Sequence, residues 1–383
     1  MNTRKKKIIL VVTGGRADYG LLRPVMREIQ KSKTLTLRVL ATGMHTLHSH
    51  GYSLDLVRRD AMPIATVVPI APQDSMLDAL AKEIKGIGDY CTKHRPDLIV
   101  VLGDRDEPFA AAIVGGHLGV PVAHLNGGDK TGDVVDEYIR HAITKFSHLH
   151  FPISHASARR VALLGEEKSR IFQTGGSGLD ELRALPLPTA AVVAQRYNLS
   201  LQKPWFFVMH HPASLGTTGY KAQIAPMLAS VARLEGEKML IYPNADTGSK
   251  EFITEIDKYK HRPDFHIYKN IPRADLIAIL KRCTLLIGNS SMGIIDASFL
   301  RVPTVNVGTR QAGRERGGNV LDCGYDATSV NRAINKALSP AFRKKVAKSK
   351  SPYGGGRAAP RIVRAIEENI GRKDLFRKKL TYV

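Results

Sequence analysis

Apolar runs alternate with amphipathic segments along the first half of the chain. Ile8–Val12 and Leu98–Leu102 are continuous apolar runs, which is typical of strands buried on both faces of a parallel sheet. Between them, apolar residues recur with the spacing of a helix face, at Leu21, Leu22, Val25, Met26 and Ile29. The same patterns predict strands at 35–40, 122–125 and 149–153, and helices at about 76–87, 107–117, 134–146 and 156–164. This alternation predicts a doubly wound α/β domain.

The alternation is interrupted at residues 175–203, where clustered glycines and prolines predict an interdomain connection. It then resumes, with strands predicted at 205–209, 239–242, 265–268, 284–287 and 304–307. Residues 349–360 are predicted to form a loop, followed by a final helix over about 361–370. We therefore expect two Rossmann-like domains, the first over residues 1–178 and the second over residues 179–360.

Two distant segments share one pattern. Residues 103–129 and 287–315 each contain a polar loop after a strand, a helix rich in small residues, and a second short strand entered through Val-Pro. Parallel α/β sheets bind ligands at such loops, at the carboxyl ends of their strands. Because the pattern occurs once in each half, the sequence predicts a two-domain enzyme with its site in an interdomain cleft.

The chain is strongly basic, with 57 Lys and Arg residues, 35 Asp and Glu residues and a formal charge of +22. Such a charge suits nucleic-acid or membrane binding, but also a solvated surface that serves an anionic small-molecule substrate. The excess is largest over Arg343–Val383, with thirteen basic residues against three acidic ones. Because this segment lacks the regular aromatic interleaving of single-strand binders, we do not expect nucleic acid as the partner.

The composition otherwise resembles that of ordinary globular proteins. A chain of 383 residues suits two hydrophobic cores better than one. No apolar run approaches the ~20 residues needed to cross a bilayer, and the N-terminal apolar stretch is too short for a signal peptide. Cys91, Cys283 and Cys323 have neither disulfide nor metal spacing, which is typical of a reducing compartment. We expect a cytoplasmic protein that makes no membrane contact.

The loop after the first strand, Thr13–Gly20, is a candidate anion site. Its glycines permit close backbone approach, and the helix that follows offers amides at its N-terminus. Arg16 is the residue we expect to bind a phosphate or a carboxylate. The alternative is a turn in which Arg16 pairs with Asp18. The glycine spacing is not GxGxxG, so a dinucleotide is not indicated.

Acidic residues follow two adjacent predicted strands of the first half. Asp104 ends the strand at 98–102 and is either a catalytic base or only a helix N-cap. Asp129 follows the next strand, and Asp136 and Glu137 open a helix, where acids also complement the helix dipole. Because the loops after adjacent parallel strands converge, we expect these carboxylates to act together.

The second half offers polar loops suited to a nucleotide. His211 ends one strand, and Arg310 follows another. Hydroxyls and helix-start amides near residue 290 form a plausible diphosphate cradle, followed by an acid that could accept ribose hydroxyls. The residues concerned are Ser290, Ser291, Gly293 and Asp296. The alternative is a capped helix next to a basic loop.

At these residues the sequence resembles the hydrolysing UDP-N-acetylglucosamine 2-epimerases of sialic-acid and legionaminic-acid biosynthesis. The matching motifs keep their order over about residues 8–320: GGRADYG, GDRDEPFAAA, HLNGGD, DEYIRHAITKFSHLHF, HHP, NADTGSKE, GNSSMGIIDA and GTRQAGRE. The resemblance implies a GT-B-like fold of two Rossmann-like domains, with the C-terminal helix, within 361–383, crossing back to the first. It also implies a homo-oligomer, either a dimer or a tetramer, and no metal or nicotinamide cofactor.

The resemblance implies cleavage of a UDP- or GDP-linked amino sugar with inversion at C2. The C1–O bond breaks largely first, a carboxylate takes the C2 proton to give a glycal, and water adds back. The implied catalytic residues are Asp104, Asp129, Asp136, Glu137, His45 and His211. The implied nucleotide and diphosphate ligands are Arg16, Arg105, Asn244, Ser290, Ser291, Gly293, Asp296 and Arg310.

The chain differs from its relatives at some of the positions that are implied to act as catalytic acids and bases. Asn126 stands where some relatives carry a Glu that is a proposed acid/base, and Asp129 is one methylene shorter than the usual Glu. Val134 and Val135 stand where relatives often pair two acids. The open alternatives are a GT-B glycosyltransferase, a nucleotide-sugar hydrolase that does not epimerise, and a non-catalytic protein that binds polyanions.

Overall fold

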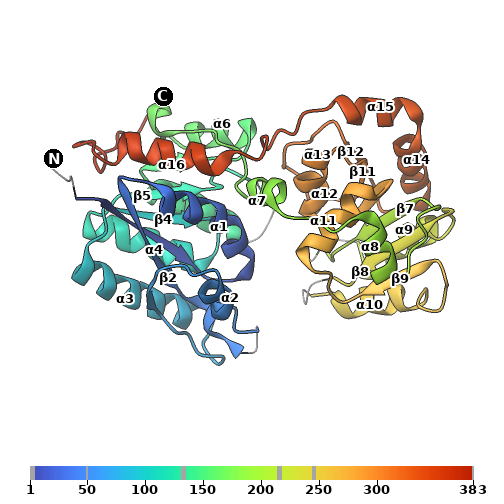
Figure 1. The fold of residues 1–383 in the computed structure, drawn as a ribbon, viewed down its shortest axis with the longest axis horizontal. Helices are drawn as coiled ribbons and strands as arrows, with labels where there is room; N and C mark the ends of the chain where they lie inside the picture. Colours follow the sequence, from blue (N-terminus) through green and yellow to red (C-terminus); the bar gives the residue numbers. More distant parts are fainter. Residues whose placement is uncertain (1–4, 49–50, 131–134, 214–217, 244–246, 382–383) are drawn as a thin grey trace. The chain divides into compact units, whose positions relative to one another are not determined.

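The chain forms two compact units. The computed structural model describes residues 5–48, 51–130, 135–213, 218–243 and 247–381. The first unit contains the described residues of Met1–Lys130, Val134–Arg183 and Tyr353–Val383, and the second contains those of Ala184–Pro352. Figure 1 shows both units, with the C-terminal segment in red returning to the first.

The first unit is built on a six-stranded sheet in the order β3-β2-β1-β4-β5-β6, and every neighbouring pair is parallel. This is the order of a Rossmann sheet. The strands are β1 (Lys7–Thr13), β2 (Leu35–Ala41), β3 (Ile64–Val67), β4 (Leu98–Leu102), β5 (Val122–Leu125) and β6 (Leu149–Phe151).

Helices cover both faces of this sheet. Alternate residues of a strand point to opposite faces, so Ile9 packs in the layer of α1 (Arg16–Lys31) and α16 (Ala358–Asn369), while Leu10 packs in the layer of α3 and α4. Figure 1 shows α16 beside α1. The other helices are α2 (Leu54–Arg59), α3 (Met76–His94), α4 (Asp106–Leu118), α5 (Val135–Phe146), α6 (His155–Leu163) and α7 (Gly178–Ala184), with short 3₁₀ helices η1 (Gly43–Thr46) and η3 (Lys168–Arg170).

The second unit repeats the same design. Its sheet has the order β12-β11-β10-β7-β8-β9, again wholly parallel. The strands are β7 (Trp205–Met209), β8 (Glu237–Ile241), β9 (Phe265–Tyr268), β10 (Leu285–Gly288), β11 (Thr304–Val307) and β12 (Val320–Cys323). The helices are α8 (Ala190–Arg196), α9 (Tyr220–Val231), α10 (Ser249–Asp257), α11 (Arg273–Arg282), α12 (Ser291–Ile294), α13 (Asp296–Leu300), α14 (Ala327–Leu338) and α15 (Pro340–Lys348).

The identical strand order fixes where each unit can bind a ligand. In such sheets the crevice opens where the strand order reverses direction, beyond the carboxyl ends of the two central strands. In the first unit these strands are β1 and β4, and in the second they are β7 and β10. Four of the polar loops found in the sequence follow these strands, and those with Asp129 and Arg310 follow the neighbouring β5 and β11.

Three expectations about local structure are corrected. Residues 175–203 are not an irregular connection throughout, because they contain α7 and α8. The predicted loop at 349–360 ends early, since α16 begins at Ala358, where the Asp180 carboxylate accepts hydrogen bonds from the amides of Ala358 (2.8 Å) and Ala359 (2.7 Å). The strands β3 and β12 were not predicted, and both lie at sheet edges.

The basic C-terminal segment is anchored to the first unit through a buried carboxylate. Glu166 is 1% exposed and accepts hydrogen bonds from Lys145 (2.8 Å) and Lys378 (2.9 Å), and it contacts His150 Nε2 (3.2 Å). Arg170 donates to the carbonyl oxygens of three residues of the segment, Asp374, Leu375 and Arg377. Part of the positive charge of this segment therefore forms internal contacts.

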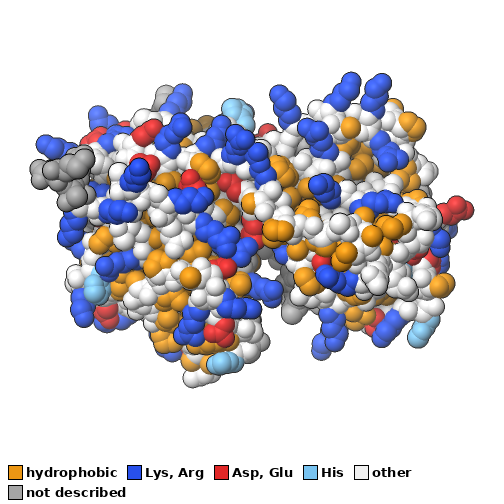
Figure 2. All heavy atoms as spheres, viewed as in Figure 1, with side chains coloured by type: hydrophobic (Ala, Val, Ile, Leu, Met, Phe, Trp, Pro, Cys, Tyr) orange, Lys and Arg blue, Asp and Glu red, His pale blue; other side chains and the backbone are white. Residues whose placement is uncertain are grey.

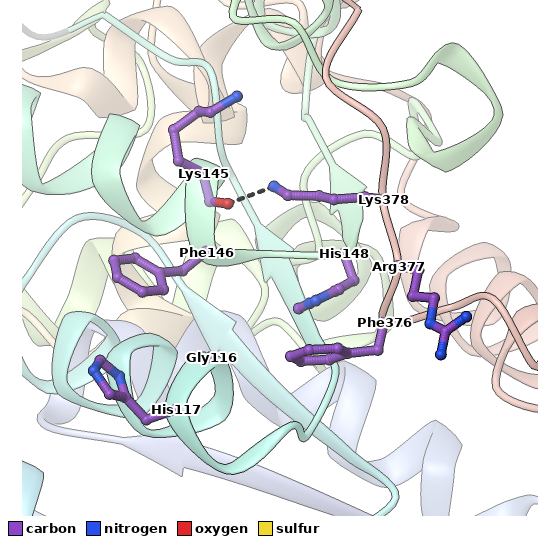
Figure 3. Close-up of a pocket in the computed structure, with 8 residues that line it drawn as sticks. All are labelled: Gly116, His117, Lys145, Phe146, His148, Phe376, Arg377 and Lys378. Atoms are coloured by element: carbon purple, nitrogen blue, oxygen red, sulfur yellow. Dashed lines mark hydrogen bonds between the residues drawn. The ribbon is translucent and has the colours of Figure 1, made fainter.

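A pocket of about 450 Å³ lies beside this anchor, as Figure 3 shows. Its lining includes Phe146 and Phe376, and the Phe376 ring stacks on His148 with 4.7 Å between centroids. Lys378 points to the carbonyl oxygens of Lys145 and Ser147. Because β6 begins just after His148, the pocket lies at the amino ends of the strands, the edge opposite the predicted site.

Lys and Arg side chains are spread over the visible face of both units rather than gathered in one stripe (Figure 2). Among the helices that the structure describes, none has the length and apolar character needed to cross a membrane.

Candidate active site

The loop after β1 is closed by the first turn of α1. Asp18 accepts hydrogen bonds from the amides of Gly14 (2.9 Å) and Gly15 (2.7 Å) and from the Thr13 hydroxyl (2.7 Å). Asp18 therefore satisfies the amides of both of these glycines in the loop that was predicted to bind an anion. Arg16 is exposed, and within the described part of the chain no ion pair joins it to Asp18. The alternative turn, with Arg16 paired to Asp18, does not occur.

His45 lies in η1, just after β2, and is fully buried. Its Nε2 lies 3.0 Å from the Thr13 hydroxyl and its Nδ1 lies 2.8 Å from the Ser53 hydroxyl. Because Thr13 gives its hydroxyl hydrogen to Asp18, it can only accept from His45, which assigns the proton to Nε2. Burial lowers the pKa of His45, and the negative charge of Asp18 offsets this effect only in part. The ring is therefore neutral. His45 thus links the loops after β1 and β2.

Arg140 gathers the acidic candidates of the first unit. It lies on α5 and is 2% exposed. Its guanidinium pairs with the Asp104 carboxylate, donates to the Asp129 carbonyl oxygen (3.1 Å) and donates to Glu137 (3.0 Å). The structure therefore brings Asp104, Asp129 and Glu137 together, as the sequence predicts. Arg140 itself was not among the predicted site residues, although its spacing of three from Glu137 on one helix is visible in the sequence.

Asp129 and Asp136 differ in their surroundings. Asp129 is 6% exposed, and the Ser157 hydroxyl lies 3.5 Å from its carboxylate. Asp136 is half-buried and lies near Asp106. Burial raises the pKa of Asp106, the positive charge of Arg105 opposes this increase, and the negative charge of Asp136 adds to it. Asp136 therefore extends the acidic group along the start of α4.

Asn126 has a backbone conformation that suits its residue type. Its φ is 64°, in the left-handed region, which Asn tolerates better than most side chains. The neighbouring Gly128 also has a positive φ, and a Cβ there would lie 2.3 Å from the Ser157 carbonyl oxygen. The loop after β5 is therefore tightly constrained where the chain departs from its relatives.

In the second unit, Asn289 joins the loops after β7 and β10. It is fully buried, its Oδ1 accepts from the amide of His211 (2.7 Å), and its Nδ2 donates to the carbonyl oxygen of His211 (2.8 Å). Its own carbonyl oxygen accepts from Gln311 (2.9 Å) and from Arg310 (3.3 Å), beyond β11. Asn289 thus connects three loops through its side-chain amide and its backbone carbonyl oxygen, a role that the sequence did not reveal.

The two histidines after β7 have different environments. His210 stacks on Phe252, with 5.5 Å between ring centroids, so it belongs to the core. His211 is 4% exposed, and burial together with the positive charge of Arg310 lowers its pKa to about 4. His211 is therefore neutral near pH 7 and can act there as a neutral hydrogen-bond donor.

The start of α12 combines two predicted ligands with a packing position. Ser290 is the N-cap and accepts from the amide of Met292 (3.3 Å), and Ser291 is half-buried beside it. A Cβ on Gly293 would lie 2.8 Å from Thr304 Cγ2, so this glycine faces β11 and brings the helix close to the sheet. Asp296 pairs with Arg273 at 2.8 Å.

Three further points complete the comparison with the predicted site. Arg105 is exposed, and its Nε lies 3.4 Å from Glu107 Oε2. Asn244 lies outside the described residues. Within the described ranges, no three His, Cys, Asp or Glu side chains are grouped closely enough to hold a metal ion.

Two Rossmann-like units, with polar loops at both strand-order reversals, give the chain the GT-B-like architecture. Comparison with known proteins defines the class further. The family model described as UDP-N-acetylglucosamine 2-epimerase matches residues 27–367. The chain is 35% identical to a UDP-N,N'-diacetylbacillosamine 2-epimerase (hydrolyzing) of Legionella pneumophila, covering 94% of this chain and 95% of that protein. It is 33% identical to polysialic acid biosynthesis protein P7 of Escherichia coli, covering 96% and 95% respectively.

Solved structures show the same fold. The crystal structure of a Neisseria meningitidis UDP-GlcNAc 2-epimerase bound to UDP-GlcNAc superposes with a TM-score of 0.82 at 19% identity, covering 94% of this chain and all of that one. The chain belongs to the UDP-N-acetylglucosamine 2-epimerase family, and it is an enzyme of the hydrolysing, nucleotide-sugar type.

Proposed function

We propose that the substrate is a UDP-linked 2-acetamido sugar, such as UDP-N-acetylglucosamine or a derivative substituted at C4 and C6. The products are then the nucleoside diphosphate and a free sugar inverted at C2. A single observation carries the assignment of the reacting groups: Arg140 holds Asp104, Asp129 and Glu137 together at the carboxyl edge of the first sheet. The L. pneumophila relative, which acts on UDP-N,N'-diacetylbacillosamine by its name, supports the substrate class.

The reaction requires stabilisation of the leaving group and acid–base catalysis. The C2–H bond of the sugar is a weak acid until the C1–O bond has largely broken. The leaving diphosphate takes the electrons of that bond, a carboxylate then removes the C2 proton, and a glycal with a C1=C2 double bond results. Water adds its hydroxyl at C1, and a proton returns to C2 from the opposite face. Donors must therefore stabilise the diphosphate, and carboxylates must exchange the proton.

We assign the removal and return of the C2 proton to the carboxylates of the first unit. Asp104 is the base that removes it, because the guanidinium of Arg140 fixes the orientation of its carboxylate. Asp129, Asp136 and Glu137 are assigned to returning it to C2 and to activating water. The buried His45 is assigned to positioning the loop near the sugar, and the exposed Arg16 and Arg105 to contacting the diphosphate.

The second unit is assigned to the nucleotide. Ser290, Ser291 and neutral His211 offer uncharged donors to the diphosphate, and Arg310 offers a positive charge close to His211. Gly293 contributes by letting α12 approach the sheet. Asp296 and Asn244 are assigned to the nucleoside. We also propose that the enzyme is cytoplasmic, as its few scattered cysteines indicate, and that it forms a homo-oligomer, as the resemblance to its family implies.

The decisive experiment incubates the protein with UDP-N-acetylglucosamine, UDP-N,N'-diacetylbacillosamine and the GDP-linked sugars in deuterated water. We expect release of UDP and a C2-inverted sugar that carries deuterium at C2. A glycosyltransferase or a simple nucleotide-sugar hydrolase leaves the original proton at C2, so its retention would reject epimerisation. Absence of UDP release with every sugar would reject the substrate class.

A further inference from the structure

Two buried carboxyl groups contact the loop that carries His45 and have no role in the proposed catalytic mechanism. Glu83 lies on α3 and is 1% exposed, and Glu107 lies in the first turn of α4 and is 5% exposed. In the part of the chain that the structure describes, the Oε2 atom of each is buried without a hydrogen-bond partner. Buried carboxyl groups are costly unless they are neutral or paired. Glu107 lies near the positive charge of Arg105, whereas Glu83 forms no ion pair among the described residues.

The contacts of Thr42 determine where one proton lies. Its hydroxyl oxygen is 2.8 Å from the carbonyl oxygen of Val68 and 3.1 Å from Glu83 Oε1. A threonine hydroxyl carries one hydrogen, and a carbonyl oxygen can only accept. If that hydrogen satisfies the closer Val68 oxygen, the contact with Glu83 is favourable only when Glu83 itself carries a proton and donates it. The hydrogen-bond geometry therefore indicates a protonated Glu83.

The charges around Glu83 agree with this conclusion. Burial, followed by the negative charge of Glu107, raises the pKa of Glu83 to about 8. Asp106 adds to the increase, and the positive charge of Arg105 opposes it. A hydrogen donated by Thr42 would also oppose it, but the Val68 carbonyl oxygen takes that hydrogen. At neutral pH the pair therefore keeps a proton on Glu83.

Glu107 fills the space between two loops. A Cβ on Gly14 would lie 2.3 Å from Glu107 Cδ, and a Cβ on Gly43 would lie 2.4 Å from Glu107 Oε1. The carboxyl group thus lies against the backbone of the loops after β1 and β2, and only glycine fits at either position. Burial raises the pKa of Glu107, Arg105 opposes the shift and Asp18 adds to it. Glu107 Oε2 lies 3.4 Å from Arg105 Nε, which connects it to the loop after β4.

We propose that Glu83, in its protonated form, and Glu107 are positioning residues that together hold the loop Thr42–Thr46 against the loop Thr13–Arg16. Glu83 holds Thr42, Glu107 packs on Gly43 and Gly14, and the amide of His45 donates to the Gly14 carbonyl oxygen (3.1 Å). This rests on the proposed role of these loops in binding the sugar and the diphosphate. Loss of the Glu83 proton removes the donor to Thr42 and places two negative charges side by side, so the loop loosens.

The test compares the pH dependence of kcat between wild type and Glu83→Gln over pH 6 to 10. The glutamine amide still donates to Thr42 but does not titrate. We expect wild-type kcat to fall at least tenfold above pH 8, and the variant to stay within threefold of its value at pH 7. Asp89→Asn is the matched control, since Asp89 is an exposed carboxylate of the same helix. It should keep the wild-type profile.

A second measurement reads the proton directly and does not depend on the variant being active. Infrared spectroscopy of wild type should show a protonated carboxyl band at pH 7 that disappears at pH 10 and is absent from Glu83→Gln. If the variant fails to fold, the wild-type titration of this band decides. A missing band at pH 7, or an alkaline decline unchanged in the variant, overturns the proposal. A wild-type enzyme that releases no UDP instead rejects the proposed function, whatever the band shows.

Discussion

The Asp104 carboxylate, at the end of β4, is ion-paired with Arg140, which lies 36 residues later on α5 and is 2% exposed. The same guanidinium donates to the Asp129 carbonyl oxygen at 3.1 Å. One buried cation thus controls the orientation of a carboxylate and the path of the loop after β5. A guanidinium can do this because its five donors have a fixed planar geometry.

Asp104→Asn should abolish most turnover while the protein still binds UDP. An amide can accept a hydrogen bond but cannot remove a proton, so kcat should fall by roughly 10²–10⁴. Steady-state kinetics and calorimetry with UDP check this expectation. Asp55→Asn, at an exposed carboxylate, is the control and should behave as wild type. An Asp104→Asn enzyme with most of its rate would show that another group is the base.

Arg140→Lys should lower kcat by about 100-fold even though it keeps the charge. Lysine provides a point charge and cannot contact Asp104, Glu137 and the Asp129 carbonyl oxygen in the same geometry, and displacement of reacting groups by about 1 Å has an effect of this size. UDP affinity should remain within threefold of wild type. Equal rates for Arg140→Lys and wild type would mean that only the charge matters.

Asn289→Asp should reduce both stability and UDP affinity. Aspartate can still accept from the His211 amide, but it cannot donate to the His211 carbonyl oxygen, so a buried hydrogen bond is lost. Such a loss costs about 1–3 kcal/mol in the free energy of unfolding. Urea denaturation measures the first effect and calorimetry the second. A stable variant with weak UDP binding would separate the role of Asn289 in the loops from its role in folding.

Arg310→Ala should weaken UDP binding at least tenfold without unfolding the protein. The variant removes a positive charge from the proposed diphosphate site, and charged hydrogen bonds contribute about 1.5–3 kcal/mol. Because Arg310 also lowers the pKa of His211, that pKa should rise towards its usual value. Calorimetry and an NMR titration of the histidines test the two effects separately. Unchanged affinity would exclude Arg310 from the site.

Glu166→Gln should destabilise the first unit, and the difference should depend on pH. Burial by itself raises the pKa of Glu166, but hydrogen bonds from His150, Lys145 and Lys378 outweigh it and lower the pKa to about 2. A lowered native pKa means that the ionised group stabilises the fold above the usual carboxyl range, and that this stability is lost as the pH falls towards 2.

Wild type should therefore exceed Glu166→Gln by about 3 kcal/mol at pH 7, the usual cost of removing one partner of a buried ion pair. The difference should shrink as the pH falls below about 4. Denaturation at several pH values measures it. Glu368→Gln, at an exposed carboxylate of α16, is the control. A difference that does not change with pH would show that packing, rather than charge, anchors the C-terminal segment.

The central strands could be predicted because their sequences are apolar on both faces. The bounds of β4, β5 and β7 agree with the prediction to the residue. The strands β3 and β12 were missed because they lie at sheet edges and are only partly buried, so their sequences lack a continuous apolar run. The start of α16 was placed late, since its amides are capped by Asp180, which is 178 positions away in the sequence.

The grouping of Asp104, Asp129 and Glu137 followed from the rule that loops after adjacent parallel strands converge. What connects them did not follow, because Arg140 resembles any helical arginine until its burial is known. His45 illustrates the converse. A resemblance placed it near the sugar, yet the structure gives both of its ring nitrogens partners within the protein, Thr13 and Ser53. Residue type and position in the sequence predict which side chains lie close together better than they predict the protonation state of each side chain.

The first unit draws its last helix from the end of the chain. Ile362 and Ile366 of α16, and Leu375 beyond it, complete the core that Ile9 and Val11 of β1 begin. During synthesis, the first strand emerges from the ribosome long before these side chains exist, whereas the described residues of the second unit all fall within Ala184–Pro352. The second unit can therefore finish folding while the first still exposes an apolar face, and a nascent chain stopped before α16 leaves that face open to chaperones and proteases.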